Sequence, residues 1–492
     1  MDFKLLKKAI VIIFLGQSYL PSFAQTNKPN VLFIAVDDLR AELGHFENSS
    51  IITPNLDKLA SEGVSFINHF VQVPTCGASR AAFLTGKRPI RTAELGNYIM
   101  FDEFPNKPDS EIPETFIHHL RRNGYYTVGI GKISHSTDGY VYGYEEAVSE
   151  QRELPYSWDE LLFDSGKWGT GWNAFLGYAD GGNRESMKKQ VKPYEAGEVD
   201  DLGYPDGLTT QLAIKTLRKL KDQSEPFFLG VGLFKPHLPF TSPKKYWDLY
   251  NEEDIPLAKN PAIPQHISTT SLMPSSEFNQ YALGEEKAGV NKQLSEAYAR
   301  KIKHAYYAAA SYSDAQIGLI LDELKALDLD QNTIVIIWGD HGWHLGEQQI
   351  WGKHTLFENA LNSALIFKIP GSKVSKIDNS IVESVDIYPT LMELVGIESH
   401  SGLDGESFAN LLKTKKSQMG NIAYSYYNKG ISMRTDRYRL TKYFREAEPT
   451  IELYDHQTDP LESVNIAAEN PEIVAELLPL LEKGNTGLYD KK

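Results

Sequence analysis

Short apolar runs alternate along the chain with longer stretches whose apolar positions recur at helical spacing. The apolar runs at 30–36, 125–131, 227–234 and 333–338 predict buried strands. Residues 295–327 predict a long helix before the last strand, and Thr53-Pro54 predicts a helix start that Gly63 ends. Because strands and helices alternate at distances that suit parallel crossovers, the pattern predicts an α/β fold.

The pattern changes near residue 420. Four short strands without intervening helices are predicted at 422–427, 431–435, 438–444 and 451–455, and a last helix is predicted from Pro471. We therefore expect a large, mixed but mostly parallel sheet flanked by helices over residues 25–415. A small antiparallel α+β subdomain should occupy residues 416–492. Residues 135–205, rich in Gly, Tyr, Trp and Asp, predict long loops at the active site.

Composition and charge narrow the class of protein. The 492 residues are 41% hydrophobic and 23% charged, which is typical of globular proteins and excludes a disordered or collagen-like chain. One cysteine excludes a disulfide scaffold. Fifty basic and 65 acidic residues give a net charge of −15, which argues against general nucleic-acid binding. An anionic substrate would need a locally positive pocket.

The first 24 residues have the parts of a secretory signal peptide. A lysine-containing start is followed by an apolar stretch at 9–15 and by small residues before a predicted cut after Ala24. The alternative is a membrane anchor, but the apolar stretch is too short to span a bilayer, and no later run of 18 apolar residues occurs. We expect an exported protein, periplasmic or secreted, without a membrane span.

Polar residues follow four of the predicted strands. Any one such group has an alternative as an ordinary polar loop, but in parallel sheets these strand ends share one edge, where ligands bind. The residues are Asp37 and Asp38, Lys132 and His135, Lys235 and His237, and Asp340 and His341. The three aspartates suit a hard divalent cation, although the residues alone leave the metal open.

Cys76 lies in the segment Pro74–Arg80, just before the apolar residues 81–84. This pattern predicts a helix that starts after the cysteine, with Ser79 as a possible cap. The helix dipole and Arg80 would then stabilise an anion at position 76, which suits a nucleophile. The alternative is a small, buried and inert cysteine.

Several motifs together resemble the type I, formylglycine-dependent sulfatases. The central one is CGASRAAFLTGKRP at 76–89; PNVLFIAVDDLR from Pro29 and GKISH from Gly131 also match. KPHLPF from Lys235, GDHGWHLGE from Gly339 and WGK from Trp351 are most similar to the iduronate-2-sulfatase branch. The resemblance implies an alkaline phosphatase-like superfold. This sequence departs from the commonest motif at Ala78, where that motif has proline. The difference leaves open which maturation enzyme generates the formylglycine.

The resemblance also implies roles for individual residues. Cys76 would be converted to formylglycine, whose hydrate is the nucleophile. One Ca²⁺ would be held by Asp37, Asp38, Asp340 and His341 with the modified Cys76. Arg80 would orient the hydrate, and Lys132 and Lys353 would bind sulfate oxygens. His135 would hydrogen-bond the formylglycine hydroxyl, His237 would be the general acid to the leaving alcohol, and Lys235 would contact substrate.

The resemblance implies that the exported protein hydrolyses sulfate esters, with sulfated saccharides as substrates. A uronic acid 2-sulfate and a sulfated algal glycan remain open, and we expect exo action on an oligosaccharide end. Asn97, Tyr98, Trp343 and His344 are candidates for a sugar pocket, each with a structural alternative. Two other functions also remain open: a phosphonate or phosphate ester hydrolase of the same superfold, and a non-catalytic secreted glycan-binding protein.

Overall fold

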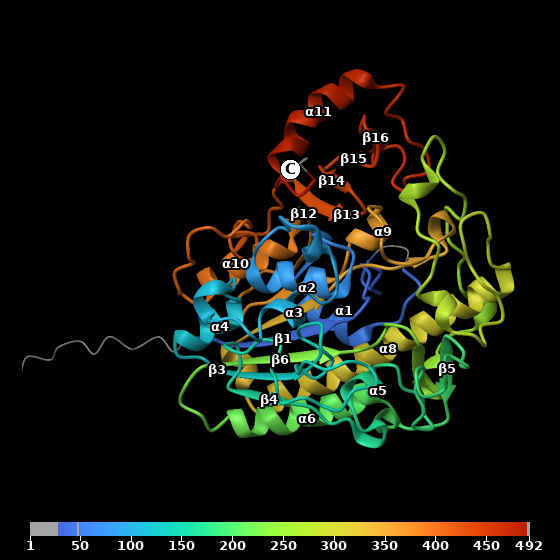
Figure 1. The fold of residues 1–492 in the computed structure, drawn as a ribbon. Coiled ribbons are helices and arrows are strands. Elements are labelled where there is room, and N and C mark those ends of the chain that lie inside the picture. The colour runs from blue at the N-terminus through green and yellow to red at the C-terminus, as the bar shows by residue number, and fades with distance from the viewer. Residues whose placement is uncertain (1–27, 47–48, 490–492) are drawn as a thin grey trace, which may run out of the picture.

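A computed structural model describes residues 28–46 and 49–489; the expected signal peptide lies outside these residues. Its centre is an eight-stranded sheet in the order β12-β2-β11-β8-β1-β6-β3-β4 (Figure 1). The strands are β1 (Asn30–Val36), β2 (Val64–Phe70), β3 (Tyr126–Gly131), β4 (Glu160–Leu162), β6 (Phe227–Leu233), β8 (Thr333–Gly339), β11 (Leu365–Lys368) and β12 (Lys376–Glu383). β1 pairs in parallel with β6 and β8, whereas β11 is antiparallel to both of its neighbours. The predicted mixed, mostly parallel sheet is confirmed.

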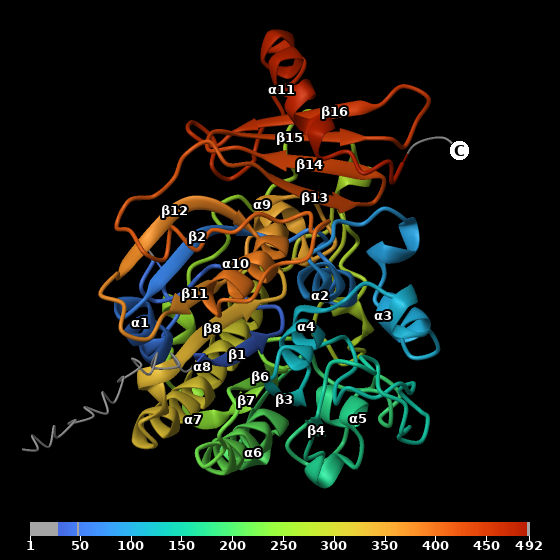
Figure 2. The same ribbon diagram turned by 90° about the vertical axis from the view of Figure 1, so that its left-hand side faces the viewer.

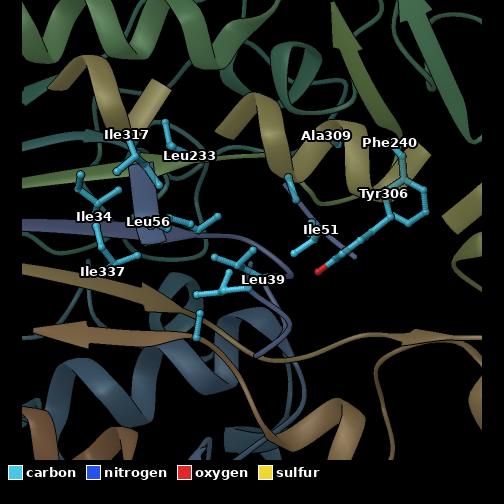
Figure 3. Close-up of a cluster of buried hydrophobic side chains, with 14 of the residues drawn as sticks. Ile34, Leu39, Ile51, Leu56, Leu233, Phe240, Tyr306, Ala309, Ile317 and Ile337 are labelled. Atoms are coloured by element: carbon cyan, nitrogen blue, oxygen red, sulfur yellow. The ribbon is translucent and has the colours of Figure 1, made fainter. Parts of the chain in front are cut away.

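Helices cover both faces of this sheet (Figures 1 and 2). Leu32, Ile34 and Val36 of β1 point to one face, and the residues between them point to the other, as strand geometry requires. The first face packs against α1 (Pro54–Ser61), α6 (Pro205–Leu220) and α8 (Glu296–Ala326). The second packs against α2 (Cys76–Thr85), α4 (Phe116–Arg122) and α10 (Ile387–Leu394). Figure 3 shows Ile34 and Ile337 of the sheet beside Ile317 of α8.

A separate antiparallel sheet forms the predicted C-terminal subdomain. Its strands are β13 (Ala423–Tyr427), β14 (Gly430–Arg434), β15 (Tyr438–Tyr443) and β16 (Thr450–Asp455), and α11 (Pro471–Lys483) packs on it. Figure 1 shows this unit, in red, at one end of the larger sheet. Its existence is confirmed, while the boundary at residues 415 and 416 stays a prediction.

Short elements complete the larger part of the chain. They are α3 (Ile99–Glu103), α5 (Gly171–Phe175), α7 (Lys244–Trp247), α9 (Glu358–Leu361), β5 (Tyr194–Gly197), β7 (Phe240–Pro243), β9 (His344–Leu345) and β10 (Trp351–Gly352), with single-turn 3₁₀ helices between them. The expected long loop of 135–205 therefore contains β4, α5 and β5. In the described part of the chain, no helix combines the length and apolar character needed to cross a membrane.

Candidate active site

Four neighbouring strands of the large sheet end at the same edge. β8, β1, β6 and β3 are adjacent and parallel, so the polar residues that follow them are brought together from distant parts of the chain. The backbone N–H of Asp38, after β1, donates to Asp340 Oδ1, after β8, at 3.0 Å. Asp38 adopts a left-handed conformation with φ 59°, which few residues other than glycine tolerate at low cost. The strand ends thus build one buried polar site.

Cys76 is the first residue of α2, and its thiol points into this site. Its Sγ lies 3.1 Å from Lys353 Nζ and 3.3 Å from His341 Nε2. Burial raises the pKa of the thiol, so the unmodified side chain is protonated at neutral pH. A Cβ on the next residue, Gly77, would lie 2.0 Å from the Asn97 carbonyl oxygen, which explains the glycine there.

The predicted cap at Ser79 is wrong. The N-cap position of α2 belongs to Thr75, and the Ser79 hydroxyl instead donates to the backbone carbonyl of Asp340. The sequence predicted the helix start within one residue, but the hydroxyl is used to tie α2 to the end of β8. This contact holds the Cys76 end of the helix against the aspartates.

Positive side chains surround the aspartates. Arg80 Nε donates to Asp340 Oδ2 at 3.0 Å, and Arg80 Nη2 lies 2.9 Å from the same oxygen as an ion pair. Lys132 pairs with Asp37, and Lys353 Nζ lies 2.9 Å from Asp38 Oδ1. Burial alone would raise the pKa of Asp37, but the nearby cations, with Lys132 foremost, hold it well below its usual range. For Asp38 burial outweighs Lys353 and raises the pKa to about 7.

The same carboxylates have oxygen atoms left over. Asp37 Oδ1 and Asp38 Oδ2 are buried and, among the described residues, receive no hydrogen bond. Four potential metal-ligand atoms lie within 4.8 Å of one another, one each from Asp37, Asp340, His341 and Cys76. Unpaired carboxylate oxygens are the ligands that a hard divalent cation prefers. The residues therefore fit a metal ion such as Ca²⁺.

His237 and Lys235, which follow β6, have different surroundings. His237 Nε2 lies 3.9 Å from Asp38 Oδ2 and 3.0 Å from Glu277 Oε1. The Lys235 amine is buried and donates to the backbone carbonyls of His237 and Pro239, at 2.9 and 2.6 Å. Lys235 thus supports the segment that carries His237, and its substrate contact stays a prediction.

His135, after β3, is buried, and among the described residues neither ring nitrogen has a hydrogen-bond partner. Burial lowers its pKa well below the usual value, so the ring is neutral and available to a ligand. The ring centroid of Tyr98 lies 5.5 Å away in an edge arrangement, and Tyr98 is 44% exposed. Trp343 and His344, by contrast, are fully buried, and His344 bonds to Thr355.

Sequence reasoning missed Glu277. Its carboxylate contacts His237 and lies 3.6 Å from Lys353 Nζ. The residue belongs to a segment without helical or strand periodicity, so no local signal marked it. Only the packing of that segment against the strand ends brings it into the site.

Known proteins are similar to this chain over most of its length. A family model described as Sulfatase matches residues 29–397, and one described as N-sulphoglucosamine sulphohydrolase, C-terminal, matches 346–485. A sulfatase of Formosa agariphila is 31% identical over 90% of this chain and 84% of its own. Human iduronate 2-sulfatase is 32% identical over 76% of this chain and 70% of its own.

Solved structures share the fold. BT4656, in complex with its substrate D-glucosamine-2-N,6-O-disulfate, has a TM-score of 0.70 at 21% identity, covering 95% of this chain and 99% of that one. The phosphonate monoester hydrolase of Agrobacterium radiobacter has a TM-score of 0.72 at 21% identity, covering 93% and 96%. The fold is therefore shared with a protein whose substrate is a sulfated sugar and with a phosphonate monoester hydrolase.

An α/β protein with a buried, charged site at the carboxyl ends of parallel strands is the class that the fold and site define. Within that class, the family model covers most of the chain, and relatives above 30% identity cover more than two thirds of it. The chain belongs to the sulfatase family and is a sulfuric ester hydrolase. The predicted relationship to iduronate-2-sulfatase is confirmed.

Proposed function

We propose that this protein is an exported carbohydrate sulfatase that uses a formylglycine made from Cys76 and one Ca²⁺. The observation that carries the proposal is the position of Cys76 Sγ, which lies 3.1 Å from Lys353 Nζ. The same sulfur lies within 4.8 Å of potential metal-ligand atoms of Asp37, Asp340 and His341. A nucleophile at that point is next to cations that can bind an anionic ester. Relatives named for sulfated sugars support the saccharide, and the predicted signal peptide 1–24 supports export.

Two groups would be added to the chain. Asp37, Asp38, Asp340 and His341, with the modified Cys76, would hold the Ca²⁺, and the buried carboxylate oxygens without donors support that set. When present, the metal supplies positive charge to sulfate oxygens, and the formylglycine hydrate supplies the attacking hydroxyl. A formylglycine-generating enzyme that accepts Ala78 must act on the chain.

The side chains of the chain itself supply the remaining chemistry. Lys132 and Lys353 bind sulfate oxygens, while Arg80 orients the group at position 76. His237 donates a proton from Nε2 to the leaving sugar oxygen, because an alkoxide is a poor leaving group. The neutral His135 accepts a proton as sulfate leaves. Lys235 holds the His237 segment, and its contact with the substrate is part of the proposal.

The names of two relatives support particular classes of sulfated substrate. Iduronate 2-sulfatase among them supports a uronic acid 2-sulfate, and the Formosa agariphila relative called an ulvan-active sulfatase supports an algal glycan. We propose exo action on an oligosaccharide end, with residues 25–415 as the catalytic domain and 416–492 as the subdomain beside it.

The test begins with a peptide mass at Cys76 from protein matured in a competent host, followed by a panel of sulfated oligosaccharides. We expect formylglycine at residue 76 and sulfate release from a sugar end. A strong preference for matched phosphate or phosphonate esters would favour the hydrolase that shares the fold. Binding of glycans without turnover by the matured protein would favour the non-catalytic alternative.

A further inference from the structure

Glu277 is a mostly buried carboxylate in the active site, with 18% of its side chain exposed. Its Oε1 lies 3.0 Å from His237 Nε2 and its Oε2 lies 3.6 Å from Lys353 Nζ. Burial opposes its ionisation, yet the positive charges of Lys353 and His237 hold the pKa of Glu277 well below its usual range. It is therefore an anion placed between the proposed leaving-group acid and a proposed sulfate ligand.

The His237 ring is restrained on three sides. Its Nδ1 lies 2.6 Å from the Leu238 carbonyl oxygen, which can only accept, so Nδ1 donates there. The Phe175 ring lies over the imidazole with centroids 4.5 Å apart. Glu277 is the closest partner of the third side, Nε2, which is the atom that must face the leaving oxygen. The Leu238 and Phe175 contacts thus anchor the ring, and Glu277 is the closest group that acts on Nε2 itself.

Glu277 is itself held by a packed turn. The next residue, Phe278, is buried, and its ring centroid lies 5.9 Å from that of Trp351. Trp351 begins β10, immediately before the segment that carries Lys353. Since the turn and the Lys353 segment pack together, the carboxylate keeps a defined place relative to both cationic groups.

We propose that Glu277 is a positioning residue that holds His237 Nε2 toward the leaving oxygen. This inference rests on the proposed function, in which His237 is the leaving-group acid. When the sulfur–oxygen bond of the ester breaks, the Nε2 proton moves to the sugar oxygen. Glu277 neither gains nor loses a proton; the incoming ester oxygen replaces it as the nearest partner of Nε2, and the carboxylate remains beside the ring.

Glu277 could instead serve only as a counter-ion to Lys353. Substrates with different leaving groups distinguish this role from the positioning of His237. A sugar alkoxide needs the proton of His237, whereas a nitrophenolate leaves without it. Loss of positioning should therefore slow sugar sulfates and spare activated aryl sulfates. Damage to the sulfate-binding cations should slow both.

The experiment compares wild type, Glu277→Gln, His237→Ala and the double variant, all with measured formylglycine content. Substrates are a sugar sulfate and a nitrophenyl sulfate that the wild type hydrolyses. For Glu277→Gln we expect kcat to fall about 10- to 100-fold on the sugar sulfate and less than about threefold on the aryl sulfate. The double variant should be no slower than His237→Ala, because both changes act on one group.

Glu452→Gln is the matched control, since Glu452 is a buried carboxylate bonded by the Ser271 hydroxyl in the C-terminal subdomain. It should leave the ratio of the two rates unchanged. Equal losses on both substrates, or additive losses in the double variant, would overturn the inference. Glu277→Asp replaces Glu277→Gln if the latter does not fold, with the same expected ratio. If the wild type hydrolyses no sulfate ester, the proposed function fails, and the role of Glu277 fails with it.

Discussion

Two of the charged clusters in the described part of the chain differ in one respect. The candidate-site cluster lies at the sheet edge and joins Asp37, Asp38, Asp340, Arg80, Lys132, Lys353 and His341. The interface cluster joins Glu358 of α9 to Arg434, Arg439, His456 and Glu462 of the C-terminal subdomain. Both place at least three potential metal ligands within 4.8 Å of one another.

The difference lies in what remains unpaired. Glu462 accepts from Arg439, His456 and the backbone N–H of Glu358, and Glu358 accepts from both arginines. In contrast, Asp37 and Asp38 of the candidate-site cluster keep buried oxygens that receive no hydrogen bond from the part of the chain that the structure describes. Proximity of carboxylates alone therefore does not define a metal site, because among the described residues every buried carboxylate oxygen of the interface cluster has a hydrogen-bond partner. The open oxygens mark the other as a place for ligands.

The largest effect should follow from removing the nucleophile of the open cluster. Cys76→Ala eliminates the proposed formylglycine, and we expect turnover of sulfate esters to fall by at least about 10⁴-fold. In the absence of Ca²⁺, thermal stability should change far less than activity, because the charged side chains around residue 76 all remain. A kcat above about one per cent of wild type would contradict the assignment of residue 76.

Breaking the closed cluster should reduce stability. Arg439→Met leaves Glu358 and Glu462 buried without their shared partner, at an expected cost of about 3–5 kcal/mol in the free energy of unfolding. Denaturant unfolding measures this loss. Arg437→Ala, which removes a pair between an exposed arginine and Asp455, is the control and should cost less stability than Arg439→Met. An unchanged unfolding midpoint for Arg439→Met would show that the cluster is not structural.

Calcium should distinguish the two clusters directly. After chelation, Ca²⁺ at a hundredfold excess over its dissociation constant should stabilise the wild type by about 3 kcal/mol. Asp37→Asn should weaken this response, whereas Glu462→Gln should retain it from a lower baseline. Thermal melts with and without Ca²⁺ provide the measurement. The reverse pattern would place the metal at the interface cluster.

His69 of β2 offers a third case, a buried titratable group with neutral partners only. Its ring contacts Ser384 and Ser363, and burial lowers its pKa to about 4. The unfolded chain, with a histidine pKa near about 6.5, binds the proton first as pH falls. Because of His69, the free energy of unfolding should therefore be about 2 kcal/mol lower at pH 5 than at pH 7.

Unfolding of His69→Asn across pH 7 to 5 checks this value. The variant should show a flatter pH dependence than the wild type by the amount assigned to His69. Parallel pH curves for the two proteins would mean that the buried ring is charged in the folded state.

Much of the fold followed from local pattern. The strands β1, β3, β6 and β8 lie within one or two residues of their predicted bounds, and the helix predicted at 295–327 is α8, Glu296–Ala326. These elements are buried and strongly periodic, so the local signal is clear. Ser79 shows the limit: its position resembled a cap, but its hydroxyl found a tertiary partner in Asp340.

The candidate site was predictable where a residue follows a strand. Parallel strands must bring Asp37, Lys132, His237 and Asp340 to one edge, whatever the rest of the chain does. Glu277 had no such constraint, because its segment lies between regular elements. The hydrogen bonds of Lys235 could not be predicted from the sequence either, because its amine donates to two backbone carbonyls whose positions depend on the folded loop.

The sequence by itself determined the α/β class, the lone cysteine at a helix start and the charged groups at four strand ends, because these depend on periodicity and on neighbours along the chain. The tertiary structure alone decided which carboxylate oxygens stay unpaired, which lysine faces Cys76 and where Glu277 lies. Those features depend on distances of a few ångströms between residues far apart in sequence, and such distances are set only when the core packs.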